Sequence, residues 1–180
     1  MKLIMDTNAL ITVCKFSVEG DLLIKLILEV CYITIPSTVK EEAIAAKDIY
    51  SDAKVASDFI ESGRIEVAQA TIPELTFLKD YNLGKGEKGA IRLCLERKSK
   101  INNLITDDRL TYIVCDRMRI PKLFFLDLVI ELAKQGEIDP KFAEKIIKVA
   151  SSRYSRGMVT HSFAILKEVL GNGRSKSKEA

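Results

Sequence analysis

The hydrophobic pattern of the chain alternates between short apolar runs and longer segments with helical spacing. Runs rich in apolar and β-branched residues predict strands at residues 1–5, 31–36, 64–70, 102–106 and 122–127. Apolar positions three and four residues apart predict helices at residues 21–30, 37–46, 51–63, 72–84, 86–98, 107–118 and 128–136. Because strands and helices alternate throughout residues 1–136, we predict an α/β fold with a largely parallel sheet.

Residues 137–180 have a different pattern, which is helical throughout. Two helices are predicted, over residues 139–157 and 159–171, and the small, charged tail 172–180 is expected to be disordered. A segment of this size is too short to bury a robust core alone. We therefore expect a helical extension that packs on the α/β body or on a partner.

Local signals also predict where some helices begin and end. Ser37 or Thr38 is expected to cap the start of the 37–46 helix, because a side-chain oxygen there accepts a hydrogen bond from a free backbone N–H. Gly63 and Gly136 are expected to end two other helices.

The composition is that of an ordinary soluble globular protein, with 47% apolar and 29% charged residues. The net charge of +3 is too small to imply nucleic-acid binding by itself. Residues 131–180 hold ten Lys and Arg against six Asp and Glu, a balance of +4 that leaves −1 for residues 1–130. A basic surface, if present, is therefore expected toward the C-terminal part.

The cysteine spacing and the length of the apolar runs indicate the cellular compartment of the protein. The four cysteines are far apart and form no C-x-x-C pair, which argues against a structural zinc site and favours a reducing compartment. No targeting segment is visible, and no apolar run approaches the roughly 18 residues that a membrane span needs. We expect a cytoplasmic protein.

Acidic residues come at or shortly after the ends of several predicted strands. In an open parallel sheet, the carboxyl ends of the strands form the edge at which ligands bind. Carboxylates gathered there repel one another unless a cation lies between them, and oxygen ligands suit Mg²⁺ or Mn²⁺ better than zinc. Four segments contribute acids near this edge: Asp6, Glu41 with Glu42, Glu87, and Asp107 with Asp108.

Each of these acids also has an ordinary structural interpretation. An Asp after a strand is usually a turn residue or a helix N-cap, and paired glutamates early in a helix usually face solvent. The sequence "GKGE" lacks the spacing of a phosphate-binding P-loop. The only histidine, His161, lies far from the acids and is interpreted as a surface or packing residue. The coincidence of four acidic segments nevertheless favours a metal site.

Four short segments carry a family resemblance. In order along the chain, "IMDTNALI", "IPSTVKEEA", "LGKGEKGAI" and "LITDDRLTYIV" resemble the four motifs of the PIN domain nucleases. The resemblance covers about residues 1–130, nearly all of the α/β part. It implies a parallel-sheet, three-layer fold and a PIN-like nuclease domain over residues 1–136. The helical extension 137–180, predicted from the hydrophobic pattern, exceeds the compact toxin form of that family.

The resemblance also implies a function. Most members are metal-dependent endoribonucleases, hydrolases that cleave phosphodiester bonds of RNA with Mg²⁺ or Mn²⁺, and many are the toxin of a toxin–antitoxin pair. RNA, an antitoxin protein and a second copy of the chain are the partners it implies. The alternative is a non-catalytic RNA- or partner-binding module on the same fold. A phosphatase with a nucleophilic Asp is disfavoured, because such enzymes usually have a second Asp where this chain has Asn8.

Site residues follow from the same resemblance. It implies metal-binding, catalytic acids at Asp6, Glu42, Glu87 and Asp108. Asp107 is kept as an alternative second ligand or an N-cap, and Thr7 and Asn8 are expected to shape the site. Lys85 and Arg109 flank the acids and are candidates for contact with phosphate, although solvated surface charge explains them at least as well.

Overall fold

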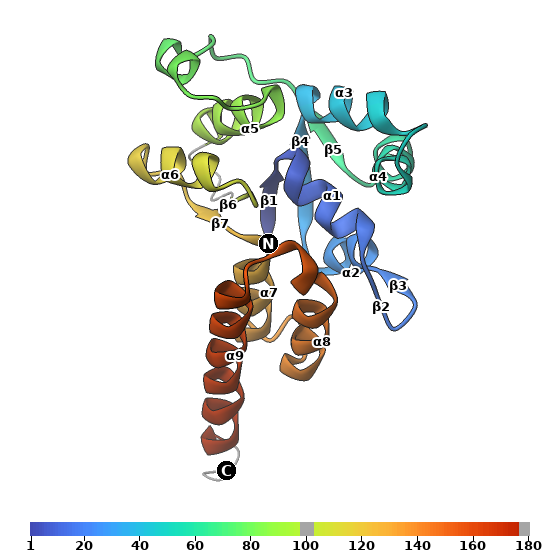
Figure 1. The fold of residues 1–180 in the computed structure, drawn as a ribbon, viewed down its shortest axis with the longest axis vertical. Coiled ribbons are helices and arrows are strands. Elements are labelled where there is room, and N and C mark those ends of the chain that lie inside the picture. The colour runs from blue at the N-terminus through green and yellow to red at the C-terminus, as the bar shows by residue number, and fades with distance from the viewer. Residues whose placement is uncertain (98–102, 177–180) are drawn as a thin grey trace.

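The computed structural model describes residues 1–97 and 103–176 of the chain (Figure 1). Within them, five parallel strands form one sheet in the order β5-β4-β1-β6-β7. Leu3 in the central strand β1 pairs with Ile33 on one side and with Asn103 on the other. The strands are β1 Lys2–Met5, β4 Tyr32–Pro36, β5 Glu66–Ala68, β6 Asn103–Ile105 and β7 Lys122–Leu123.

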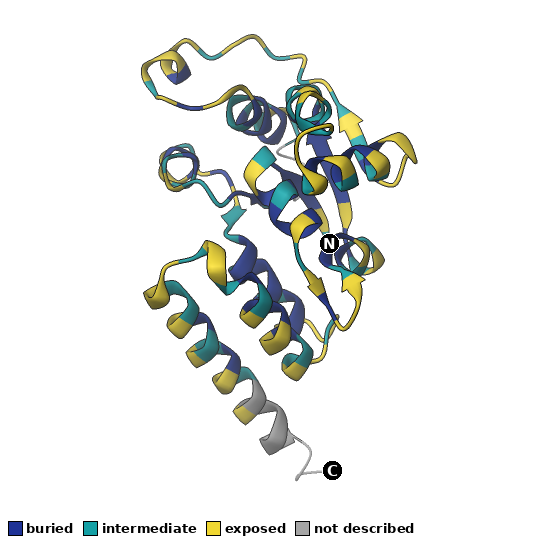
Figure 2. Ribbon diagram, turned by 45° about the vertical axis from the view of Figure 1, so that its right-hand side comes forward, coloured by how far each residue is buried: buried dark blue, intermediate teal, exposed yellow. Residues whose placement is uncertain are grey.

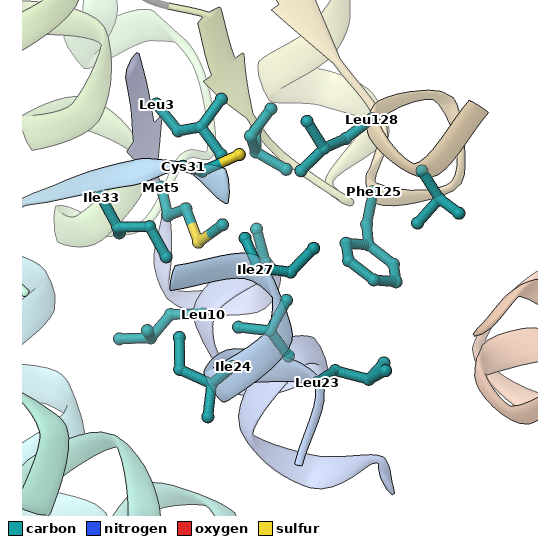
Figure 3. Packing of buried hydrophobic residues seen from close by; sticks show 14 of the residues in the cluster. Leu3, Met5, Leu10, Leu23, Ile24, Ile27, Cys31, Ile33, Phe125 and Leu128 are labelled. Carbon is teal, nitrogen blue, oxygen red and sulfur yellow. The ribbon is translucent and has the colours of Figure 1, made fainter. Parts of the chain in front are cut away.

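Helices cover both faces of this sheet, which confirms the predicted three-layer α/β fold. Side chains alternate along β1, so Leu3 and Met5 join one buried cluster while Ile4 joins the other. Figure 3 shows Leu3 and Met5 packed over residues of α1 and α2. The helices of this part are α1 Thr7–Lys15, α2 Leu23–Val30, α3 Ser37–Ala46, α4 Ser51–Glu61, α5 Lys85–Glu96, α6 Arg109–Arg117 and α7 Phe125–Lys134.

The second cluster lies under α5 and α6. Ile91 and Leu93 of α5 and Val114 of α6 pack there around Ile4. Figure 2 shows that burial is concentrated in the strands and on the helix faces that meet the sheet. All four cysteines are buried and free, and burial raises the pKa of the Cys14 thiol to about 12. None of the helices described in residues 1–97 and 103–176 has the length and apolar character to cross a membrane.

Several predicted elements are wrong in type or in extent. The predicted helix 72–84 is only a 3-10 turn, η1 (Thr76–Asp80), within which Leu78 is the one buried residue. The predicted strand 122–127 ends at Leu123, and α7 begins at Phe125. The apolar run "LFFLDLVI" is buried on most sides, and such a run fits either a strand or a buried helix.

The starts of three other elements also differ from the prediction. Neither Ser37 nor Thr38 caps α3, because β4 remains paired through Pro36 and the helix begins directly at Ser37. Asp21 and Leu22, predicted as helix, form strand β3 (Asp21–Leu22), which pairs with β2 (Ser17–Val18). The helix α1 over Thr7–Lys15 was not predicted from the sequence.

The C-terminal part contains α8 (Pro140–Ala150), the short η3 (Ser151–Arg153) and α9 (Arg156–Lys176). The predicted helix 139–157 therefore ends early, at Ala150. The helix α9 continues through residues 172–176 of the tail for which disorder is predicted. Residues 177–180 of that predicted tail lie outside the described residues.

The C-terminal helices pack on α7 and share a core with the sheet. Ala143, Ile146 and Ile147 of α8 are buried in the same cluster as Phe125 and Leu3. Leu166 of α9 is buried there too. The helical extension is thus attached through apolar packing to the body that carries the acids.

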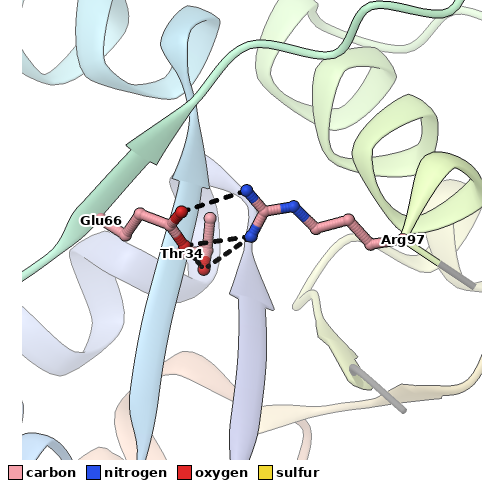
Figure 4. A network of polar contacts seen from close by, with 3 residues as sticks. All are labelled: Thr34, Glu66 and Arg97. Carbon is pink, nitrogen blue, oxygen red and sulfur yellow. Dashed lines mark hydrogen bonds and ion pairs between the residues drawn. The ribbon is translucent and has the colours of Figure 1, made fainter. Parts of the chain in front are cut away.

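A polar network fixes the far end of α5 against the sheet (Figure 4). The guanidinium of Arg97 donates to both carboxylate oxygens of Glu66 on β5, at 3.0 and 3.1 Å. Glu66 also accepts from the hydroxyl of Thr34 on β4. This contact holds α5 against the strands. It therefore also helps to fix the position of Glu87, which lies at the other end of the helix.

Candidate active site

Asp6 lies where the central strand β1 ends and α1 begins. Its amide donates to the carbonyl oxygen of Ile105 on β6 at 3.2 Å. Its Oδ1 accepts from the amide of Ala9 at 2.8 Å and so caps α1. Its Oδ2 is buried and has no hydrogen-bond partner among the described residues. One oxygen of this carboxylate therefore caps a helix, and the other remains for a further partner.

The surroundings of Asp6 disfavour its charged form. Burial raises its pKa from 3.8 to about 7, an effect that the acids Glu87 and Asp107 increase. The side chain of Thr106 and the amide of Ala9 act in the opposite direction but do not offset burial. A carboxylate in this state gains stability from a nearby cation.

Glu42 connects three elements. From α3, its Oε2 accepts from the hydroxyl of Thr7, and its Oε1 accepts from the amide of Gly86 at 3.0 Å. A Cβ atom on Gly86 would lie 2.7 Å from Glu42 Oε2 and closer still to the Thr7 hydroxyl, so only glycine fits at this place. Glu41 is exposed. Of the two adjacent glutamates, Glu42 is the one brought to the acids.

Glu87 lies in the first turn of α5, between the other acids. Its Oε1 accepts from the side-chain amide of Asn8 at 3.3 Å. Burial raises its pKa, and the charges of Glu42 and Asp108 raise it further. Since Glu87 also raises the pKa of Asp6, it couples electrostatically to all three of the other predicted metal-binding acids.

The adjacent acids Asp107 and Asp108 have different tasks. Asp108 Oδ1 accepts from the amide and the hydroxyl of Thr111, at 2.6 and 2.7 Å, and caps α6. Within the described part of the chain, no hydrogen bond to Asp108 Oδ2 is formed. The prediction of Asp107 as an N-cap is wrong, because α6 begins at Arg109 and the cap position falls on Asp108.

Asp107 uses both of its oxygens within the protein. Oδ1 accepts from the amide of Phe125 at 3.1 Å. Oδ2 accepts from the hydroxyls of Thr12 and Tyr154, at 2.9 and 2.7 Å. These contacts give Asp107 the environment of a structural carboxylate.

The predicted cations flank the acids without contacting them. Lys85 and Arg109 are the first residues of α5 and α6, and both are exposed. His161 is exposed on α9. It is not among the clustered acids.

Thr12 and Tyr154 belong to this site but were not found from the sequence. Thr12 follows Asn8 by one helical turn on α1, and its hydroxyl also lies 2.9 Å from the Asn8 carbonyl oxygen, so its single proton is shared between that oxygen and Asp107. That i, i+4 spacing is a signal that places Thr12 beside the motif. Tyr154 is separated from Asp107 by 47 residues, and nothing in its local sequence indicates the contact.

The acids suit a hard divalent ion in their chemistry. In residues 1–97 and 103–176, no three acidic, histidine or cysteine side chains converge closely enough to hold one ion directly. The donors nevertheless fit such an ion, because they are all oxygens and Asp6 Oδ2 is buried without a hydrogen-bond partner among the described residues. In addition, the charge of Glu87 raises the pKa of Asp6, and the charges of Glu42 and Asp108 raise the pKa of Glu87. Asp6, Glu87 and Asp108, with Glu42 beside them, are the residues that would hold it.

Comparison with known proteins identifies the family. No curated protein matches this chain. A family model described as the PIN domain matches residues 2–169, a range that includes every acid of the cluster and most of α9. This match covers far more than half of the 180 residues. The chain therefore belongs to the PIN domain family.

Proposed function

We propose that this protein is a metal-dependent endoribonuclease that hydrolyses phosphodiester bonds of RNA. The observation that carries the proposal is the buried, unpartnered Oδ2 of Asp6, in an acid whose charge couples to Glu87 and, through Glu87, to Glu42 and Asp108. Membership of the PIN domain family supports it, since PIN domains are generally nucleases that use divalent metals.

The chain's own residues supply binding and orientation. Thr7 holds Glu42, and Asn8 holds Glu87, so the second and third residues of the "DTN" motif set the position of two acids. Lys85 and Arg109 stand at helix N-termini, where backbone N–H groups and the helix dipole favour a phosphate. A bound Mg²⁺ or Mn²⁺ would supply an activated water and neutralise the charge that develops on the phosphate.

A toxin role, an antitoxin partner, a homodimer and a cytoplasmic location remain predictions from the family resemblance and from the cysteine pattern. No contact described above tests them. The non-catalytic alternative is disfavoured by the sequence itself, since every acid of the four motifs is present.

The proposal is tested by cleavage of single-stranded RNA with Mg²⁺, with Mn²⁺ and with EDTA. Asp6→Asn, Glu42→Gln and Asp108→Asn should each lower kcat by more than about a hundredfold, because even residues that only support a metal ligand contribute ten- to a hundredfold. The side chain of Asn at position 6 can still accept a hydrogen bond from the amide of Ala9, so the Asp6→Asn variant is expected to fold.

Glu41→Gln is the matched control for Glu42→Gln, since it removes the neighbouring charge from an exposed position. It should retain activity close to that of the wild type. Undiminished cleavage by metal-stripped protein in EDTA would contradict the metal-dependent mechanism. Equal losses in Glu41→Gln and Glu42→Gln would contradict the assignment of Glu42.

A further inference from the structure

The carboxylate of Asp107 is held by donors from three separate elements. Thr12 belongs to α1, Phe125 is the first residue of α7, and Tyr154 lies between η3 and α9. Two hydroxyls share Oδ2, at 2.9 and 2.7 Å, and a backbone amide takes Oδ1. A carboxylate with this many donors is a rigid attachment point for the segment that carries it.

That segment carries Asp108. The amide of Thr106 donates to Leu123 on β7 at 3.1 Å, and the amide of Asp108 donates to the Thr106 hydroxyl at 3.2 Å. Asp107 lies between these two residues, so its hydrogen bonds fix the strand exit just before Asp108. A shift of Asp107 would move the Asp108 carboxylate relative to Glu87, with which it interacts.

The C-terminal extension holds Tyr154 in place beside Asp107. Tyr154 packs against the main hydrophobic cluster, and the helix before it is anchored by buried Ile146, Ile147 and Ala150. Burial and the charge of Asp107 raise the pKa of the Tyr154 hydroxyl, so the phenol stays neutral and remains a donor. The apolar packing of the extension thus fixes a single hydroxyl against the site.

We infer that Tyr154 is a positioning residue of the nuclease site, which acts through Asp107 to set the place of Asp108. The inference rests on the proposed function for its catalytic consequence. The C-terminal helical extension thereby becomes part of the framework of the active site. The two are joined by a hydrogen bond between Tyr154 and Asp107, which are 47 residues apart in sequence.

The test uses full-length Tyr154→Phe, which removes the hydroxyl and keeps the ring. In metal-free protein, the amide resonances of Asp108 and Thr111 in a ¹H–¹⁵N NMR spectrum should shift. Mn²⁺ binding measured by calorimetry should weaken. With RNA, kcat should fall roughly tenfold or more while KM changes little, because small displacements of reacting groups have large effects on rate.

Tyr50→Phe is the matched control, since it removes a hydroxyl from an exposed tyrosine at the start of α4. It should change neither the resonances nor kcat. Asp107→Ala provides a second measurement, because alanine cannot accept a hydrogen bond from Tyr154. If Tyr154 acts only through Asp107, adding Tyr154→Phe to Asp107→Ala should lower kcat no further, whereas independent effects would multiply.

Unshifted Asp108 and Thr111 resonances in Tyr154→Phe would overturn the inference, as would multiplicative effects in the double variant. A loss of thermal stability with unchanged kcat and unchanged Mn²⁺ binding would also overturn it, because that is a purely structural role. A wild-type protein that cleaves no RNA would contradict the proposed function instead, and the NMR comparison would still decide whether Tyr154 positions the Asp108 loop.

Discussion

At the scale of single residues, Asp6 and Asp108 use their two carboxylate oxygens in the same way. Asp6 and Asp108 each use Oδ1 to cap the helix that follows, α1 and α6. The helix caps fix where these side chains lie, and the other oxygen remains for an external partner. An Asp at a strand end that caps a helix is thus compatible with a functional role, and the two interpretations of such a residue do not exclude each other.

The shifted pKa of Asp6 predicts how the stability of metal-free protein depends on pH. Its pKa is 3.8 in the ordinary state and about 7 in the fold, so the folded protein binds this proton more tightly than the unfolded chain does. The free energy of unfolding should therefore fall as pH rises from about 4 to about 7, by at most roughly 1.4 kcal/mol for each pH unit. Thermal denaturation followed by circular dichroism between pH 5 and pH 8 measures this.

Two other acids act in the same direction, because burial also raises the pKa of Glu87 and of Asp127. Exposed Glu96 acts in the opposite direction, since Thr71 lowers its pKa. Asp6→Asn should flatten the pH profile, and added Mn²⁺ should stabilise the wild type most at the alkaline end. A melting temperature that rises from pH 5 to pH 8 in metal-free wild type would contradict the assignment.

At the scale of elements, the site depends on how closely the start of α5 approaches α1 and α3. Gly86 lets its amide reach Glu42, and a methyl group there would collide with both Glu42 and Thr7. Gly86→Ala should therefore destabilise the protein by about 1–3 kcal/mol and abolish most cleavage. Urea denaturation and the RNA assay measure the two effects.

Gly157→Ala in α9 is the control for that variant. A methyl group at Gly157 meets no atom within 4 Å, and alanine favours helix over glycine. Stability should stay equal or increase, with cleavage unchanged. Equal stability and activity in Gly86→Ala would contradict the close-approach argument.

The elements differ in how well the sequence predicts them, for physical reasons. The helix 37–46 has the predicted bounds because a proline at the end of β4 limits it on one side. The sequence predicts strand for residues 124–127 and helix only from residue 128, because a helix buried on most sides has no polar stripe to reveal its period at its start. Residues 72–84 have apolar positions at helical spacing, but their neighbours provide little surface on which to bury them.

The candidate site divides in the same way. The position of acids after strands or early in helices is visible in the sequence, and it predicts Asp6, Glu87 and the pairs Glu41 with Glu42 and Asp107 with Asp108. Only the resemblance to the PIN motifs selects Glu42 and Asp108 within those pairs. The contact of Tyr154 with Asp107 was not predictable, because it depends on the way α8 and α9 pack in three dimensions. Local signals encode where a residue stands on its element, and long-range packing decides what it meets.

At the scale of the whole molecule, the helical extension and the α/β body share one core. Ile146, Ile147 and Leu166 are buried with Phe125 of α7. A chain truncated after Gly136 should therefore expose apolar surface, bind the dye ANS and unfold at a much lower temperature than the full chain. Thermal denaturation and ANS fluorescence measure both properties.

The control is a chain truncated after Gly171, which keeps Leu166 and all of α8. It should unfold close to the temperature of the full chain. A 1–136 chain with cooperative unfolding, unchanged stability and full RNA cleavage would show that the extension is dispensable.

The central place of β1 in the sheet also has a consequence for the order of events during synthesis. The strand Lys2–Met5 pairs with β6, whose residues leave the ribosome about a hundred positions later. Asp108 follows β6, and the hydroxyl that contacts Asp107 belongs to Tyr154, a further 47 residues along the chain. Asp6 and Asp108 can therefore come together only after β6 has emerged and paired with β1, so the proposed metal site is among the last parts of the fold to form.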